Sequence, residues 1–148
     1  MILLDTNVVS ALMQSPQHPS VVAWLDRQQD TDIYLPSITI AEIQYGLCRM
    51  PDGKRKAMLS RQFLVLTNTL FQGRVLVFGH AQADAYAILR TARDTQGRPM
   101  SMADAQIAAI ARVHGFALAT RNTKDFEHCG LTLINPFLID SQTDLIEA

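Results

Sequence analysis

Four acidic side chains in the sequence are candidates for one shared chemical task. They are Asp5 in ILLDTN, Glu42 in SITIAEIQYG, Asp104 in SMADAQIAA and Asp125 in ATRNTKDF. Carboxylates that crowd together repel one another, by about 4 kcal/mol per pair at ~4 Å for an effective dielectric constant of about 20. Such a cluster persists when a divalent cation neutralises it or when some members hold protons. The four acids therefore predict a metal-dependent hydrolase, and among hydrolases a nuclease.

The type of ligand indicates which metal this site would bind. Oxygen ligands such as Asp5, Asp104 and Glu42 suit Mg²⁺ or Mn²⁺ rather than Zn²⁺. Mg²⁺ usually takes one or two carboxylates directly and keeps several waters, which leaves room for a substrate phosphate. The histidines show neither pairing at i,i+4 nor the Cys/His spacing of a zinc site; they are His18, His80, His114 and His128.

Each acid also has a simpler explanation when it is taken alone. The segment Thr39–Glu42 has the pattern of a helix capping box, and Ser101–Asp104 resembles one with Asp in place of Glu. Asp5 has the features of a turn residue after a strand, and Asp125 lies in an ordinary polar loop. Capping does not explain why Asp5 would join two caps at one edge of a fold, so the hypothesis depends on their joint placement.

Other polar residues near these acids are candidates for supporting roles. Asn7 and Thr120 are candidates to hold a ligand carboxylate or a water. Arg121 is a candidate to contact phosphate, because a guanidinium matches phosphate geometry. The basic stretch Arg49–Arg61 is interpreted first as a solvated helix start, and as a function it would steer a phosphate backbone towards the site.

Length and composition limit the class of protein. The 148 residues fit one domain, and 48% hydrophobic with 18% charged residues excludes a disordered chain. The net charge of −1 does not fit a protein that coats long stretches of nucleic acid, although an enzyme that grips a short RNA segment needs only local basic patches. The two cysteines make no disulfide framework. Without a signal peptide or a membrane-length apolar run, we expect a soluble, cytoplasmic protein.

Strands and helices alternate along the sequence, which predicts an α/β fold with a mostly parallel central sheet of about five strands and helices on both sides. Strands are expected at 2–4, 33–35, 75–78, 116–119 and 132–134. Helices are expected from Thr6 or Asn7 through Leu12, from a cap at Ser20 through Leu25, and at 39–50, 54–70, 80–94 and 101–114.

This order of elements would bring the four acids together. Helix amino ends and strand carboxyl ends share one edge of a parallel sheet, and ligands bind at that edge. Asp5 ends the first strand, Glu42 and Asp104 are expected in first turns of helices, and Asp125 follows the fourth strand. Helix amino ends also favour ionised carboxylates.

Three segments give the chain a resemblance to the PIN-domain ribonucleases, and among them to the VapC/FitB-type toxins of bacterial toxin–antitoxin pairs. ILLDTNVVSAL is similar to the opening strand with its metal-binding Asp5, and SITIAEIQYGL to the second motif with Glu42. GRPMSMADAQIAAIARVHGFALATRNTKDF is the most specific part and contains Asp104. The resemblance covers nearly the whole chain, and it indicates a PIN-like nuclease domain at 1–140 and a C-terminal tail at 141–148.

The resemblance implies a Mg²⁺- or Mn²⁺-dependent endoribonuclease that forms a homodimer. It also implies a cognate antitoxin that blocks the site and contacts promoter DNA through its own binding domain, with no membrane partner. One departure concerns the fourth acid, because the Thr-Arg-Asn turn holds Asn122 and the next acid is Asp125. Asn122 offers a carbonyl or positions water but adds no negative charge.

Two alternatives stay open at the level of sequence. An acid after a buried strand also fits a phosphatase with an aspartyl nucleophile, although such enzymes usually carry a second acid where this chain has Asn7. A non-catalytic module that binds RNA or a partner protein would also fit the weak net charge.

Overall fold

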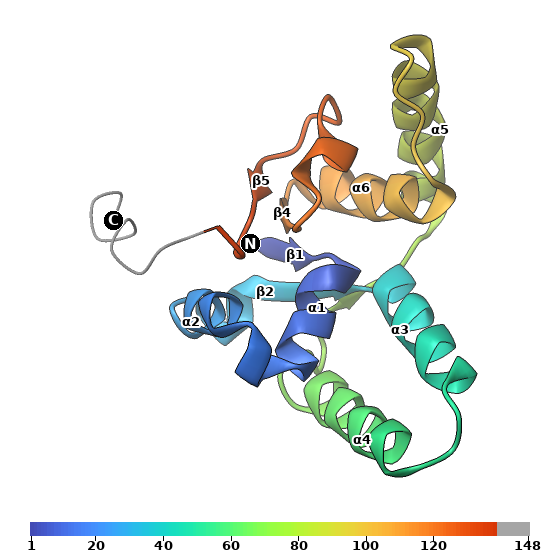
Figure 1. Ribbon diagram of the computed structural model, residues 1–148. Coiled ribbons are helices and arrows are strands. Elements are labelled where there is room, and N and C mark those ends of the chain that lie inside the picture. Colours follow the sequence, from blue (N-terminus) through green and yellow to red (C-terminus); the bar gives the residue numbers. More distant parts are fainter. Residues whose placement is uncertain (139–148) are drawn as a thin grey trace.

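The protein folds around a five-stranded parallel sheet with the strand order β3-β2-β1-β4-β5 (Figure 1). A computed structural model describes residues 1–138, and the tail expected at 141–148, together with 139–140, lies outside the described residues. The strands are short and bounded as β1 (Ile2–Leu4), β2 (Ile33–Pro36), β3 (Val75–Leu76), β4 (Ala117–Ala119) and β5 (Leu133–Ile134). β1 is central, with Ile2 in register with Ile33 on one side and with Ala117 on the other.

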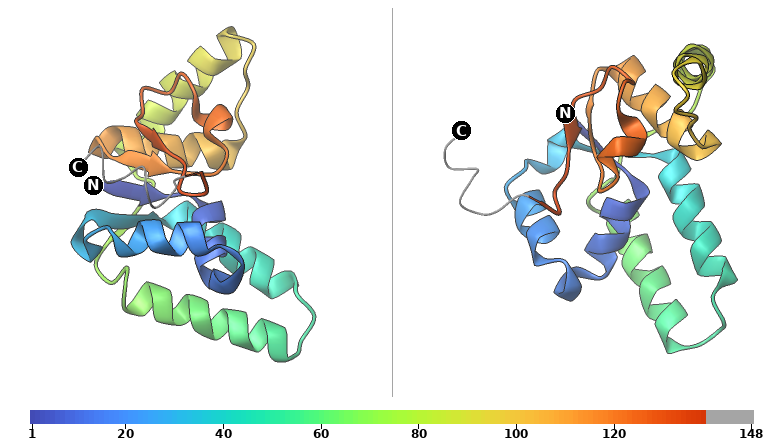
Figure 2. Two further views of the ribbon diagram at one scale, coloured as in Figure 1. Left: turned by 60° about the vertical axis from the view of Figure 1, so that its left-hand side comes forward. Right: turned by 45° about the horizontal axis from the view of Figure 1, so that its top comes forward.

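Helices cover both faces of the sheet, as the alternation of elements predicted. Figures 1 and 2 show α1 to α4 on one face and α5 with α6 on the other. The helices are α1 (Thr6–Met13), α2 (Pro19–Asp26), α3 (Ser37–Arg49), α4 (Lys54–Asn68), α5 (His80–Thr95) and α6 (Met102–His114). Three short 3₁₀ turns lie between other elements: η1 (Ser15–Gln17) after α1, η2 (Asp30–Asp32) before β2, and η3 (Thr123–Phe126) between β4 and β5.

The two faces have separate hydrophobic cores because successive side chains of a strand point in opposite directions. Leu4 packs with α1 to α4, including the fully buried Phe63, and with the fully buried Phe71 in the turn after α4. Leu3 packs on the other face with α6 and with Phe126 of η3. The central strand is therefore buried on both sides, which fixes the position of Asp5 directly after it.

The predicted elements differ from the structure mainly at their ends. α2 begins at Pro19, a residue suited to the first helical position, so Ser20 is not its cap. β3 has two residues where a strand was expected at 75–78, and exposed Val77 lies beyond its end. Helix α6 ends as predicted, with Gly115 at φ 70° in the left-handed region.

The start of α3 is the difference that matters for the site. The helix begins at Ser37 with Pro36 as its N-cap residue, two residues before the predicted start. Glu42 therefore lies in the second turn, and Thr39–Glu42 is not a capping box. Thr39 is instead fully buried and donates a hydrogen bond to the backbone oxygen of Leu4 at 3.5 Å.

No helix among the described residues is long and apolar enough to cross a membrane.

Candidate active site

Asp5 is the most buried of the four candidate acids, with 5% of its surface exposed. It follows β1 and serves as the N-cap of α1, where its Oδ1 accepts a hydrogen bond from the Thr6 backbone N–H at 2.8 Å. Its Oδ2 accepts from Thr120 Oγ1 at 2.8 Å and from Asn7 Nδ2 at 3.2 Å. Three donors thus hold the carboxylate in one orientation at the carboxyl end of the central strand.

The pKa of Asp5 is raised from 3.8 to about 6. Burial is the main cause, because it penalises the charged form, and the negative charges of Asp104 and Glu42 raise the pKa further. The hydrogen bonds from Thr120 and Thr6 act in the opposite direction. The site therefore holds an acid whose charge is incompletely compensated by the protein itself.

Thr120 and Asn7 connect this acid to the loop after β4. Thr120 is fully buried, and its Oγ1 accepts a hydrogen bond from the Asn122 backbone N–H at 3.1 Å. Asn7 Oδ1 accepts from the Arg121 backbone N–H at 3.0 Å. The Thr-Arg-Asn turn is thereby tied to Asp5 through two side chains.

Glu42 is exposed on α3, and Thr6 holds its side chain. Thr6 Oγ1 donates to Glu42 Oε1 at 2.7 Å and lies 3.2 Å from Thr39 Oγ1. Because Thr6 also donates its backbone N–H to Asp5, one residue links the first two acids. Sequence reasoning did not select Thr6 or Thr39, although the position of Thr6 directly after Asp5 is a usable signal.

Asp104 lies in the first turn of α6 and is half-buried. Ser101 caps the helix by accepting from the Asp104 backbone N–H at 3.1 Å, as the sequence pattern predicted. Burial raises the pKa of Asp104, and the charges of Asp125 and Glu42 add to that increase, whereas Arg93 lowers it. The charges of Asp104 and Glu42 thus raise the pKa of Asp5, and the charges of Asp125 and Glu42 raise the pKa of Asp104. Such mutual effects are expected for four acids at one edge of the sheet.

Asp125 lies in η3, and its side chain is exposed to solvent. Its backbone is fixed by Arg93 of α5, which is only 4% exposed. Arg93 Nη1 donates to the backbone oxygens of Asp125 at 2.9 Å and Glu127 at 2.8 Å. The sequence analysis did not identify Arg93, because a lone arginine in a polar helix gives no signal of burial.

The donor set fits a hard divalent cation. No group of three or more His, Cys, Asp or Glu side chains within residues 1–138 is already arranged as a metal site. Mg²⁺ does not require such a cage, because it takes one or two carboxylates and retains waters. A buried Asp5 with a raised pKa, next to two further carboxylates, is where added positive charge would be most stabilising.

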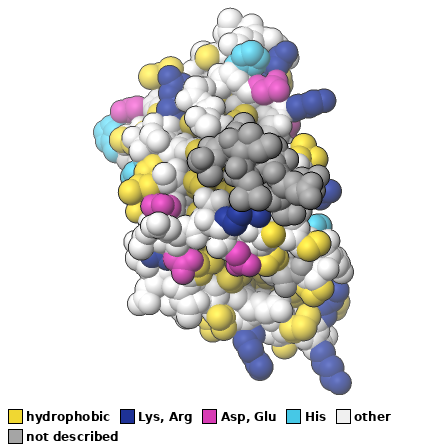
Figure 3. Space-filling view, turned by 90° about the vertical axis from the view of Figure 1, so that its left-hand side faces the viewer, with side chains coloured by type: hydrophobic (Ala, Val, Ile, Leu, Met, Phe, Trp, Pro, Cys, Tyr) yellow, Lys and Arg dark blue, Asp and Glu magenta, His cyan; other side chains and the backbone are white. Residues whose placement is uncertain are grey.

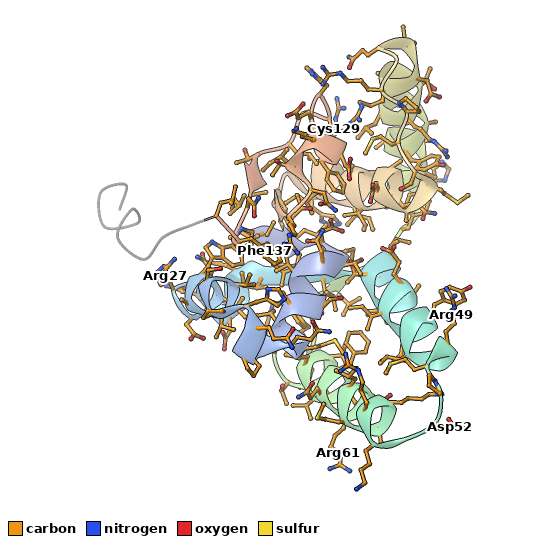
Figure 4. All side chains as sticks on the ribbon, viewed as in Figure 1. Arg27, Arg49, Asp52, Arg61, Cys129 and Phe137 are labelled. Atoms are coloured by element: carbon orange, nitrogen blue, oxygen red, sulfur yellow. The ribbon has the colours of Figure 1, made fainter. Side chains whose placement is uncertain are left out.

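The basic stretch on α4 lies away from these acids. In Figure 4, Arg49 at the end of α3, Asp52 in the turn before α4 and Arg61 on α4 point outward, away from the sheet. Figure 3 shows basic side chains that project at the bottom of the view. Lys56 pairs with Asp52 at 3.2 Å, and the Arg49 guanidinium lies over the Tyr45 ring at 5.3 Å. The stretch therefore fits its interpretation as a solvated helix start.

Comparison with known proteins decides the family. A family model described as PIN domain matches residues 2–130. The chain belongs to the PIN-domain family. A VapC ribonuclease of Sinorhizobium fredii is 42% identical over 93% of this chain and 98% of its own length. The toxin FitB of Neisseria gonorrhoeae is 39% identical over 93% of this chain and 99% of its own length.

Solved structures agree with this assignment for the PIN domain. The structure described as FitAB bound to an IR36 DNA fragment matches with a TM-score of 0.88 and 37% identity, covering 96% of this chain and 99% of that chain. A VapBC2 complex from Rickettsia felis, bound to a promoter DNA fragment, matches with a TM-score of 0.77 and 25% identity over 91% and 98%. The resemblance to VapC/FitB-type PIN domains is confirmed, and with it the class of nuclease hydrolases.

Proposed function

We propose that this PIN-domain protein is a metal-dependent endoribonuclease and the toxin of a toxin–antitoxin pair. The observation that carries the proposal is the buried Asp5 carboxylate, held by three donors and raised in pKa by burial and by the charges of Asp104 and Glu42. The similarity to a VapC ribonuclease and to the toxin FitB supports the choice of RNA as substrate.

Asp5, Asp104 and Glu42 would hold a Mg²⁺ or Mn²⁺ ion through their oxygens. Such an ion would supply a bound water of lowered pKa and positive charge that stabilises the leaving oxygen. The protein's own contribution is orientation: Thr120 and Asn7 hold Asp5, and Thr6 holds Glu42. Burial of Asp5 also limits water on one side of the site.

Asp125 and Asn122 are both proposed for the fourth position of the site. The charge of Asp125 raises the pKa of Asp104, which supports a place for Asp125 near the metal ligands. The backbone of Asn122 is fixed by Thr120, so its amide side chain extends from a rigid turn. Arg121 and Asn122 are proposed to contact the phosphate or the water.

The aspartyl-phosphatase alternative is disfavoured by the role of Asn7. An acid two residues after the nucleophile is usual in those enzymes, whereas Asn7 donates to Asp5 and accepts from the Arg121 backbone. Its amide is therefore a structural link between two loops. The nuclease proposal accounts for this contact, because the link positions a ligand carboxylate.

A partner antitoxin and a homodimer belong to the same proposal. The solved relatives FitAB and VapBC2 are described in complexes with DNA fragments. On this chain, α3 and α4 expose large apolar side chains, including Tyr45 at 65% and Leu64 at 57%. We propose that an antitoxin covers the site and that promoter DNA is contacted through it.

Cleavage of RNA by the purified protein tests the proposal. We expect Mn²⁺ or Mg²⁺ to support cleavage, EDTA to stop it, and Asp104→Asn to reduce the rate at least about 100-fold. Asp84→Asn is the matched control, since Asp84 lies on α5 within 3.6 Å of His80 and takes no part in the acid cluster. Full activity of Asp104→Asn, with unfolding unchanged, would show that the metal site is elsewhere.

A further inference from the structure

Arg93 carries a buried charge that the packing of α5 does not explain. Its side chain is only 4% exposed, and no carboxylate among residues 1–138 forms an ion pair with it. Its Nε donates to the backbone oxygen of Arg98, and its Nη1 donates to those of Asp125 and Glu127. A charge without a counter-ion in the interior is costly unless its hydrogen bonds are all in place. Arg93 and the segment 125–127 therefore fix each other.

The contacts of Arg93 flank the core residue of η3. Phe126 is 1% exposed and packs in the same hydrophobic core as α6. On either side of it, Asp125 and Glu127 have exposed side chains, and Arg93 binds the backbone oxygen of each. The Phe126 ring alone would leave the segment free to turn about one anchor. With three anchors, the direction in which the Asp125 carboxylate projects is fixed.

That direction matters because Asp104 lies nearby. η3 contacts α6, and the charge of Asp125 is close enough to Asp104 to raise its pKa. Like charges repel, so a loosely held segment would move its carboxylate away from Asp104 in the absence of a cation. The hydrogen bonds from Arg93 oppose this movement.

We propose that Arg93 is a positioning residue for the proposed metal site and holds η3 so that the Asp125 carboxylate projects beside Asp104. Arg93 acts through the backbone of Asp125 and touches neither the ion nor the substrate. The inference rests on the proposed metal-dependent function. It selects Asp125 rather than Asn122 as the fourth group of the site.

Charge and position predict opposite effects of removing Arg93. Its positive charge reaches Asp104, whose pKa it lowers, and a positive charge near a cation site weakens cation binding. If Arg93 acted only through its charge, Arg93→Met would tighten Mn²⁺ binding. If it acts by position, Arg93→Met should weaken Mn²⁺ binding about tenfold, because residues behind metal ligands contribute roughly 10–100-fold.

Calorimetric titration with Mn²⁺ in the absence of RNA, well below the thermal midpoint, measures this difference. Arg98→Met is the matched control. It removes a positive charge and the exposed ion pair with Glu127 at 3.1 Å, but keeps the backbone oxygen that Arg93 uses. We expect the control to change affinity less than about twofold. Unchanged or tighter Mn²⁺ binding by Arg93→Met would overturn the proposal.

Arg93→Lys keeps the test decisive if Arg93→Met does not fold. Lysine retains the charge, but its single amine cannot reproduce the planar fork that reaches the oxygens of Arg98, Asp125 and Glu127. We expect Mn²⁺ binding to weaken about threefold or more. Wild-type affinity in Arg93→Lys would show that the charge suffices and that the proposal is wrong.

A double-mutant cycle tests whether Arg93 acts through Asp125. Asp125→Asn should weaken Mn²⁺ binding about tenfold, and adding Arg93→Met should weaken it little further, because both changes remove the same group from the site. Multiplied losses in the double variant, or no effect of Asp125→Asn, would contradict this route.

Backbone ¹⁵N relaxation in EDTA tests the positioning without any metal. In Arg93→Met, order parameters at 124–127 should fall from about 0.85 to below about 0.6, whereas those of α6 stay unchanged. A segment 124–127 that remains as rigid as in the wild type would overturn the proposal.

The two proposals fail in different ways, because neither the Mn²⁺ titration nor the relaxation experiment involves RNA. If both give the expected results but the wild-type protein cuts no RNA, the endoribonuclease proposal fails and the role of Arg93 stands. If the wild-type protein cuts RNA while Arg93→Met binds Mn²⁺ as tightly as the wild type, the role of Arg93 fails and the nuclease proposal stands.

Discussion

Arg93 on α5 donates a hydrogen bond from Nη1 to the backbone oxygen of Asp125 at 2.9 Å, across 32 positions of sequence. Its Nε donates to the Arg98 backbone oxygen at 2.8 Å. A buried guanidinium with its donors on carbonyl groups fixes two loops at once, because each carbonyl would otherwise be buried without a partner. One side chain of α5 thereby links η3 to the loop that leads into α6, the helix that carries Asp104.

Arg93→Met should therefore loosen the loop that carries Asp125. Removing the donors leaves the backbone oxygens of Arg98, Asp125 and Glu127 without this partner. Each of these oxygens that stays buried without a hydrogen bond lowers the free energy of unfolding by about 1–3 kcal/mol. Because water reaches part of the loop, we expect a total loss of about 2–4 kcal/mol in the free energy of unfolding, measured with urea.

Arg90→Met on the same helix is the control for this change. The Arg90 guanidinium bonds to the Tyr86 hydroxyl of its own helix and lies over the Tyr86 ring, so its loss should cost under about 1 kcal/mol. Equal destabilisation by the two variants would show that Arg93 has no special role in holding η3.

The fold was predictable because hydrophobic periodicity and turn residues determine most of it. Buried Leu3 and Leu4 on a short strand, and Gly115 at the end of α6, are local signals that tertiary contacts reinforce. The start of α3 was not predictable, since Thr39 matches a capping pattern but is used to bond Leu4 and Thr6. That use depends on a contact 35 residues away.

The candidate site, like the fold, was only partly predictable from the sequence. Asp5, Glu42 and Asp104 could be selected because their place relative to strands and helices is a local property. The residues that orient them could not all be selected: Thr6 and Arg93 act through contacts that exist only in the folded chain. Asp125 was selected as an acid, whereas the role of its backbone was not visible.

Asp5→Asn should stabilise the metal-free protein above about pH 6. The folded-state pKa of Asp5 is raised from 3.8 to about 6, so folding favours the protonated form. Protonated Asp5 therefore stabilises the folded state below about pH 4, and this stabilisation is lost as the pH rises through about 6. Asn has no charge to desolvate, but it replaces one acceptor oxygen, so we expect a net gain of about 1 kcal/mol at pH 7.5.

Urea unfolding in EDTA at pH 7.5 and pH 4 measures this effect. The advantage of Asp5→Asn should shrink or reverse at the lower pH, where wild-type Asp5 is protonated. Asp84→Asn is the control, because Asp84 is exposed on α5 and lies outside the acid cluster. An advantage of Asp5→Asn that is the same at both pH values would contradict the raised pKa.

Mn²⁺ should raise the thermal midpoint of the wild-type protein, and EDTA should return it to the original value. An ion at 100 times its dissociation constant stabilises the bound state by about 2.7 kcal/mol. The shift should be smaller at pH 5 than at pH 7.5, because protons compete with the ion for Asp5. A similar shift in the double variant Asp5→Asn/Asp104→Asn would place the ion outside the acid cluster.

Thr120→Val should move the acidic limb of the cleavage profile to higher pH. The Thr120 hydroxyl donates to Asp5 Oδ2 and lowers its pKa, so its loss raises that pKa further. A hydrogen bond of about 1 kcal/mol corresponds to about 0.7 pKa unit. Thr120→Ser keeps the hydroxyl and should keep the wild-type profile, whereas Thr95→Val, at an exposed residue of α5, should have no effect. If Thr120→Val lowers the rate equally at every pH, the hydroxyl only packs against Asp5 and does not set its charge.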